Sequence, residues 1–296
     1  MAGGSTLPRR ALGRQLKAFR ERKGLSQGAS ARIMETSPQT YGRLEEGRTT
    51  KVTDLALNAL ADAFGCEIDE RRLLLDLAQE IRTASKDNRG WWQAFTDAIE
   101  VGFSHYLSLE EAAKREISCQ TTIIPGLLHT PEYRRAITWA ACPESSSEEI
   151  ERTIEVAARR QTLLTRDGFE FEAYLLESVL YAQVGSPMIM AEQLGRLLEL
   201  SELPNVDIRI IPLKAKNPIG LVARSFILLD FPPLPTSGMG EPPVVYIEGL
   251  VGDLYLENVE QVGKYSDVVR QLQAVALSKS ESRDLISATE KEWRQQ

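Results

Sequence analysis

The stretch GLSQGASARIMETSPQTYGRLEEG, residues 24–47, contains two short helical segments separated by a polar turn. Gly24 suits the end of a preceding helix, because glycine adopts a left-handed backbone at little steric cost. Ser26 suits the N-cap of the next helix, and Ser37 followed by Pro38 pairs a second N-cap with proline at the first helical position. The pattern predicts a helix-turn-helix, whose second helix can enter the major groove of DNA.

Apolar residues recur every three or four positions around this motif, which predicts helices over about 9–23, 26–34, 38–46 and 53–65. Each of these helices has one apolar face, which we expect to be buried. The expected buried residues are Leu12, Leu16 and Phe19 on the first helix, Ala29, Ile33 and Met34 on the second, Tyr41 and Leu44 on the third, and Leu55, Leu57, Leu60, Ala61 and Phe64 on the fourth.

Charge is unevenly distributed along the chain. The whole chain carries a formal charge of −7, whereas residues 1–51 hold eleven Lys and Arg against four acids, a balance of +7. Salt screens charges beyond a distance of roughly 8–10 Å, so a basic segment attracts phosphate even when the rest of the chain is acidic. The distribution favours contact with DNA by the first segment over a solvated extension of random charge.

The outward face of the third helix carries side chains suited to reading bases. Gln can bond adenine and Arg can bond guanine through two hydrogen bonds each. The expected outward residues are Ser37, Gln39, Thr40 and Arg43, and the expected phosphate contacts include Arg14, Arg48 and Lys51.

Three pieces, LGRQLKAFRERKGLSQ (12–27), SPQTYGRLEEGRTT (37–50) and LALNALADAFG (55–65), resemble the XRE, lambda-repressor-like family of helix-turn-helix domains. The resemblance extends from residue 9 to about residue 69. It implies that Gln27 touches a phosphate and braces Gln39.

The same resemblance implies a partly buried ion pair between Arg20 and Glu45, joining the first and third helices. Two positions depart from the family pattern. Ser30 stands where the family usually buries a leucine, and Glu35 stands where its turn usually has glycine. A left-handed residue other than glycine costs about 1–2 kcal/mol, so we expect a less stable domain or a different turn.

The length of 296 residues, with 43% hydrophobic and 26% charged side chains, predicts two globular domains. Three cysteines, Cys66, Cys119 and Cys142, are too far apart for a zinc site or a disulfide framework, so we expect reduced thiols, no metal and no cofactor. The chain starts without an apolar signal-like run and contains no stretch long enough to span a membrane, which favours a cytoplasmic location.

The expected organisation is a mainly α helix-turn-helix domain over residues 1–70, a helical linker over 71–90 and an α+β domain with a small sheet over 91–296. An aromatic stripe predicts a helix over 91–99, and a long exposed loop is expected over 231–243. Helical spacing covers 109–117, 131–141, 148–164, 188–200 and 259–277, and alternation predicts strands over 169–176, 206–211, 225–229, 244–248 and 253–257.

No catalytic constellation emerges from the second domain. The two histidines, His105 and His129, are far apart, and no glycine-rich phosphate loop is present. We therefore expect a protein that is not an enzyme.

Several motifs of the second domain resemble the carboxy-terminal domain of WhiJ-type, antitoxin-like actinobacterial regulators. They include IPGLLHTPEYRRA (124–136), EQLGRLLEL (192–200) and PNVDIRIIPL (204–213). The resemblance implies transcription control, often beside a gene for a small partner protein. An apolar turn before a helix start is a possible partner surface, made of Pro125, Gly126, Leu127, Leu128 and Tyr133, and a buried structural corner is the alternative.

The sequence as a whole predicts a sequence-specific, homodimeric regulator of transcription that binds double-stranded DNA and a regulatory partner. Dimers of this fold place two recognition helices about 34 Å apart on the duplex. Two alternatives remain: an antitoxin-like protein that sequesters a small partner, and a one-component sensor with a pocket near Trp91, Trp92, Tyr174 and Tyr181.

Overall fold

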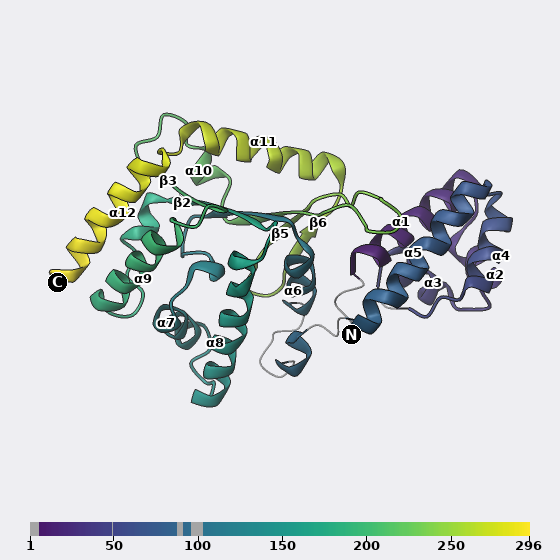
Figure 1. Ribbon diagram of the computed structural model, residues 1–296, viewed down its shortest axis with the longest axis horizontal. Helices are drawn as coiled ribbons and strands as arrows, with labels where there is room; N and C mark the ends of the chain where they lie inside the picture. Colours follow the sequence, from purple (N-terminus) through teal and green to yellow (C-terminus); the bar gives the residue numbers. More distant parts are fainter. Residues whose placement is uncertain (1–5, 49, 88–90, 96–102) are drawn as a thin grey trace. The chain divides into compact units, whose positions relative to one another are not determined.

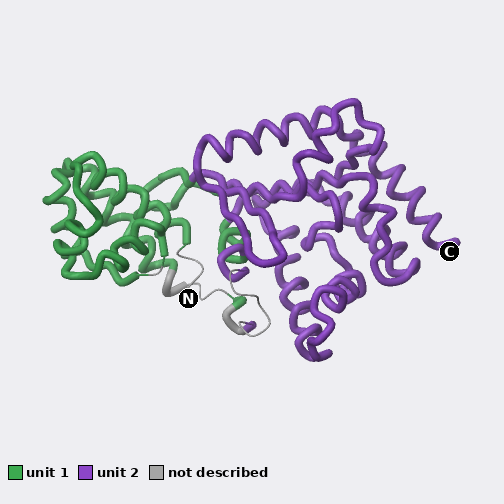
Figure 2. Tube along the Cα trace, turned by 180° about the vertical axis from the view of Figure 1, so that it is seen from behind, with its two compact units in different colours: residues 1–94, 107–112, 231–241 green, residues 95–106, 113–230, 242–296 purple. Residues whose placement is uncertain are grey.

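The computed structural model describes residues 6–48, 50–87, 91–95 and 103–296. The chain forms two compact units (Figures 1 and 2). The first unit contains residues 1–94, 107–112 and 231–241, and the second contains residues 95–106, 113–230 and 242–296. No helix in the described part of the chain is long and apolar enough to cross a membrane.

The described residues of the first unit include the helices α1 (Thr6–Arg22), α2 (Gln27–Ile33), α3 (Pro38–Glu45), α4 (Asp54–Phe64) and α5 (Ile68–Asp87). Helix α1 packs against α3, α4 and α5, while α2 packs against α3 and α4. The apolar faces meet in one core, as the spacing predicts. Its most deeply buried side chains include Leu12, Leu16, Tyr41, Leu57, Leu60, Phe64, Leu74 and Leu77.

Local capping chemistry sets the helix starts in this unit. The hydroxyls of Ser26, Ser37 and Thr53 accept hydrogen bonds from the backbone N–H three residues later. These caps confirm the predicted starts. The predicted faces need two corrections: Leu55 is 82% exposed, and α2 buries Ser30 and Ala31 in place of Ala29, Ile33 and Met34, because α2 is rotated relative to the expected face.

Helix α5 and the segment 231–241 extend the first unit beyond residue 70. Leu74, Leu77 and Ala78 of α5 are fully buried, so the expected linker is a packed helix. The segment 231–241, which we call the insert, connects two strands of the sheet. It is a loop, as expected over 231–243, and six of its residues are exposed. The expectation needs one correction: Phe231 and Leu234 are only about 5% exposed, because they are buried in the first unit.

The second unit contains a six-stranded sheet in the order β3-β2-β1-β4-β5-β6. The strands are β1 (Arg115–Gln120), β2 (Glu170–Leu176), β3 (Val206–Ile211), β4 (Phe226–Asp230), β5 (Val244–Ile247) and β6 (Leu254–Leu256). Strands β1, β2 and β3 are parallel, and β4, β5 and β6 add to the other side of β1 in antiparallel pairs. This mixed open sheet fulfils the α+β prediction.

Helices cover both faces of the sheet (Figure 1). The crossovers between parallel strands place α7 (Pro131–Ala141), α8 (Ser147–Gln161) and α9 (Pro187–Leu200) on one face, and α11 (Val259–Val275) lies on the other. Helix α12 (Lys279–Arg294) packs on α9 and β3. The remaining short elements are α6 (Phe103–Ala112), α10 (Ile219–Val222), η2 (Trp91–Phe95), η3 (Gly126–Leu128), η4 (Thr162–Thr165) and η5 (Glu177–Leu180).

Two elements of this unit differ from the prediction. The helix expected over 109–117 ends at Ala112, and its last residues begin β1. Strand β1 was missed because it buries polar residues, Glu116 and Ser118, which obscure its apolar alternation. Helix α12 was not predicted. The helix expected over 91–99 begins as η2, and Ile99 lies outside the described residues.

Candidate DNA-binding surface

The outward face of α3 is open to solvent. Ser37, Gln39 and Arg43 are exposed, and Thr40 is partly exposed. The Ser37 hydroxyl caps the helix at the N–H of Thr40 and also lies 2.9 Å from the Thr40 hydroxyl. The four residues expected to face bases therefore lie on or at the start of one short helix, whose buried side is held by Tyr41 and Leu44.

Three further residues of the predicted set are exposed on the same unit. Gln27 lies at the start of α2, and Arg48 and Lys51 follow α3. The guanidinium of Arg48 lies 2.9 Å from the Glu46 carboxylate, and both side chains are more than half exposed. An exposed pair of this kind contributes little stability and exchanges readily for another anion.

A buried ion pair joins α1 to α3. Arg20 Nε lies 2.5 Å from Glu45 Oε1, and Arg20 Nη2 lies 3.0 Å from Glu45 Oε2. The hydrogen bond that Arg20 donates to the Glu45 carboxylate raises the pKa of Arg20. This is the pair that the resemblance implies. Gln27 Nε2 donates to Glu45 Oε2 at 2.8 Å, so the structure ties Gln27 to this pair rather than to Gln39.

The turn between α2 and α3 contains an unusual backbone conformation. Glu35 has φ = 52°, in the left-handed region that favours glycine. Ser30 is fully buried, with its hydroxyl 3.4 Å from the carbonyl oxygen of Ser26. The two departures from the family pattern therefore fall at one strained turn and one buried polar position.

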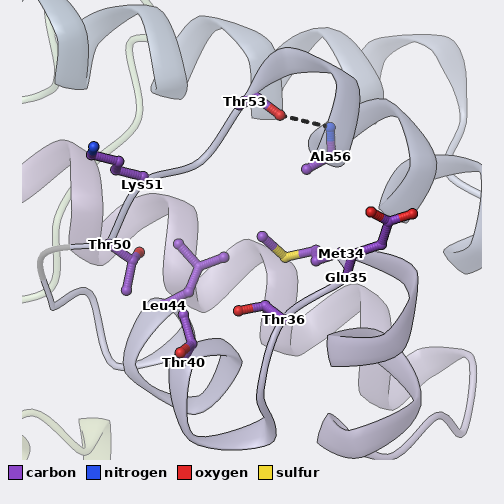
Figure 3. A pocket seen from close by; sticks show the side chains of 9 residues that line it. All are labelled: Met34, Glu35, Thr36, Thr40, Leu44, Thr50, Lys51, Thr53 and Ala56. Carbon is purple, nitrogen blue, oxygen red and sulfur yellow. Dashed lines mark hydrogen bonds between the residues drawn. The ribbon is translucent and has the colours of Figure 1, made fainter.

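A cavity of about 180 Å³ lies between the turn, α3 and the start of α4 (Figure 3). Two residues of the predicted contact set, Thr40 and Lys51, line it. The Thr50 hydroxyl is buried and has no hydrogen-bond partner in the described part of the chain. The remaining lining residues are Met34, Glu35, Thr36, Leu44, Thr53 and Ala56.

Two family models match the chain. Residues 11–74 match a helix-turn-helix domain, and residues 103–288, more than half of the chain, match a domain of unknown function, DUF5753. The chain belongs to the DUF5753 family. Neither a curated protein nor a solved structure matches it significantly. The helix-turn-helix match indicates a DNA-binding regulator, and it covers every residue of the predicted contact set.

In this DUF5753 chain, Arg14 differs from the other predicted DNA contacts because it is paired with a carboxylate of the insert. Arg14 Nη1 and Nη2 lie 2.8 and 2.7 Å from the two oxygens of Glu241, in the insert. Arg10 Nε lies 3.4 Å from the same carboxylate. Sequence reasoning missed Glu241 because no local pattern links residues 227 positions apart.

The segment expected to receive a partner is inside the DUF5753 domain. Leu127, Leu128 and Tyr133 are at most 1% exposed, and Pro125 is buried. Gly126 packs closely on Arg160: a Cβ at this position would lie 3.0 Å from Arg160 Nη1. These contacts favour the alternative interpretation, a buried structural corner, and leave no apolar surface there for a partner.

The same corner holds a buried histidine. His129 Nε2 donates to the Ile124 carbonyl oxygen at 2.6 Å, and Nδ1 has no hydrogen-bond partner among the described residues. Burial lowers the pKa of His129 to about 3, and the charge of Arg134 adds to this effect. His129 is therefore neutral near pH 7 and belongs to the core of the DUF5753 domain.

The aromatic residues proposed for a sensor pocket do not come from one unit. Trp91 and Trp92 lie in the first unit, and Tyr174 and Tyr181 lie in the second. Tyr174 is buried and donates to Glu172 Oε2 at 2.9 Å. Among the described residues, no group of three or more His, Cys, Asp or Glu side chains is arranged to hold a metal ion.

Proposed function

We propose that this DUF5753 protein is a sequence-specific regulator of transcription that reads double-stranded DNA with α3. The observation that supports this best is the exposed face of α3, which carries Gln39 and Arg43. Two exposed cations, Arg48 and Lys51, follow this helix. In this proposal Gln39 and Arg43 read bases, and Gln27, Arg48 and Lys51 hold phosphates. No catalytic role and no cofactor are proposed.

Binding as a homodimer follows from the geometry of the duplex. One α3 of eight residues contacts only a few base pairs, and two copies about 34 Å apart read a pseudo-palindrome. A cytoplasmic location is part of the same proposal. The resemblance to WhiJ-type regulators supports a small partner protein bound elsewhere on the second unit, including the antitoxin-like variant of this function.

The test is fluorescence anisotropy of the pure protein on duplex DNA from upstream of its own gene, over a series of salt concentrations. We expect specific binding with a steep salt dependence. Arg43→Ala should weaken specific binding by about 1–3 kcal/mol and relax sequence preference, while Lys51→Ala should weaken all sequences alike. Lys264→Ala, an exposed lysine on α11, is the matched control for charge.

Equal weakening of every sequence by Arg43→Ala would contradict base reading by that residue. Weak binding that ignores sequence in the wild-type protein would contradict the proposed function itself.

A further inference from the structure

The Glu241 carboxylate lies completely buried in the first unit, against two arginines of α1. Arg14 binds both of its oxygens through parallel N–H donors, at 2.7 and 2.8 Å. A guanidinium binds a phosphate group through the same forked geometry. The insert therefore supplies Arg14 with a ligand that occupies the donors a DNA phosphate would use.

The carboxylate of Glu80 also holds the insert, at a different point. Glu80 Oε1, on α5, accepts hydrogen bonds from the backbone N–H groups of Thr236 and Ser237, at 2.7 and 2.6 Å. Phe231 and Leu234 are also buried, and the Arg10 guanidinium lies 5.9 Å from the Phe231 ring centroid. Polar contacts at two points, together with the burial of Phe231 and Leu234, hold the insert in the first unit.

Arg10 of α1 packs against the segment that carries Arg48, one of the predicted phosphate contacts. Gly47, the residue before Arg48, packs directly on Arg10, because a Cβ at Gly47 would lie 2.8 Å from the Arg10 Cα. Arg14 follows Arg10 by about one helical turn. Its side chain remains 33% exposed, so another anion can reach its guanidinium once the Glu241 carboxylate leaves.

We propose that Arg14 is a masked phosphate-binding site and that Glu241 is the internal ligand that masks it. The ligand of the open site is a phosphodiester of duplex DNA, so the proposal rests on the proposed function. While the insert is in place, Glu241 withholds one phosphate contact from the duplex. When the insert moves, Arg14 is released and affinity for DNA of any sequence rises.

The test compares the affinity of full-length variants for a random 20-base-pair duplex by anisotropy over a salt series. Glu241→Gln should bind about three- to tenfold more tightly at low salt, with a salt dependence steeper by about one phosphate contact. Glu144→Gln removes an exposed acid elsewhere on the chain and controls for net charge. We expect it to change the affinity less than twofold.

A second substitution identifies the cation responsible. Arg14→Gln should leave the wild-type affinity within twofold, because Glu241 already occupies that side chain. In the Glu241→Gln background the same substitution should abolish the gain. A gain that persists without Arg14, or equal effects of Glu241→Gln and Glu144→Gln, would overturn the masked site. A loss of fivefold or more for Arg14→Gln alone would do so too, because it would show that Arg14 binds DNA with the insert in place.

Loss of a buried carboxylate can also destabilise the chain, so a second variant opens the insert from its other anchor. Glu80→Gln weakens the bonds to Thr236 and Ser237 and keeps Glu241. Faster hydrogen exchange at those two amides would report opening. We then expect tighter DNA binding that again requires Arg14, and opening without this gain would contradict the proposal.

Elution from heparin in a salt gradient separates the masked site from the proposed function, because heparin is a sulfated polyanion with no bases to read. If no variant binds DNA, Glu241→Gln should still elute at higher salt than Glu144→Gln. Identical elution of the two variants would overturn the masked site by itself.

Discussion

The backbone of Glu35 adopts a conformation that affects the stability of the helix-turn-helix. Its φ of 52° requires a conformation that glycine adopts without strain. We expect Glu35→Gly to raise the free energy of unfolding by about 1 kcal/mol, because strain relief exceeds the added chain entropy. Urea unfolding followed by circular dichroism measures this difference.

Gly24 is the matched control, since it has a similar φ of 69° and a Cβ added there would meet no neighbour within 4 Å. Gly24→Ala should lower the free energy of unfolding by about 1 kcal/mol, purely through backbone strain. A stabilised Gly24→Ala variant would show that the strain argument is wrong at both positions.

His129 makes stability depend on pH. Its pKa of about 3 in the folded chain lies below its value near 6.5 in the unfolded chain, because burial disfavours the charged ring. The unfolded state therefore binds the proton first, and stability falls as the pH drops from about 6.5 toward 3, by at most about 1.4 kcal/mol per unit.

Glutamine at this position can still donate to the Ile124 carbonyl but does not titrate. We expect His129→Gln to lose less stability than the wild type between pH 7 and pH 5 in urea titrations. Equal losses in the two proteins would contradict a neutral, buried His129.

Two glycines within helices, Gly42 and Gly13, allow packing to be tested by substitution with alanine. Gly42 lies on the partly exposed side of α3, and a Cβ there would meet Gln27 Oε1 at an ordinary contact distance of 3.5 Å. Gly42→Ala should therefore raise the free energy of unfolding by about 1 kcal/mol through helix propensity. Thermal unfolding provides the measurement, and a lower midpoint would contradict it.

Gly13 on α1 should respond in the opposite direction. A Cβ at this position would lie 2.5 Å from the carbonyl oxygens of Leu44 and Glu45, at the end of α3. Because backbone cannot give way as a side chain does, Gly13→Ala should lower the free energy of unfolding by about 1–3 kcal/mol. The same thermal assay separates the two glycines.

Elements with local signals were predictable, and those stabilised by distant contacts were not. The starts of α2, α3 and α4 are set by hydrogen bonds between residues three positions apart, with Ser26, Ser37 and Thr53 as the caps. The local sequence is therefore enough to place these helices. Strand β1 carries buried polar residues, so its burial depends on neighbouring strands rather than on its own pattern.

The candidate site divides in the same way. The residue types on α3 predicted an outward polar face, and that face is exposed. The environment of Arg14 depends on Glu241, and that of Glu80 depends on a turn more than 150 positions away. A lone acid in a Pro- and Gly-rich insert gives no sign of such a partner.

At the scale of the whole molecule, the chain passes between its two units several times. Residues 231–241 of the C-terminal part belong to the first unit, where Phe231, Leu234 and Glu241 are buried. We therefore expect that cutting a protease site placed at residues 88–90 leaves the two fragments associated. Size-exclusion chromatography under native conditions should show one peak, and dissociation should need denaturant.

Leu234→Asp is the control for that experiment, because a buried charge should displace the insert. If the cut protein that keeps Leu234 also separates into two fragments, the insert does not hold the first unit as we expect.

The insert also limits how such a protein can be recombined. A helix-turn-helix head joined to a body by one linker can be exchanged by a single crossover in the gene. Here the head is completed by a segment encoded after β4, so a transplanted head would meet an insert fitted to another α1 and α5. New DNA specificities are then reached more readily by substitutions on the outer face of α3 than by exchanging the head.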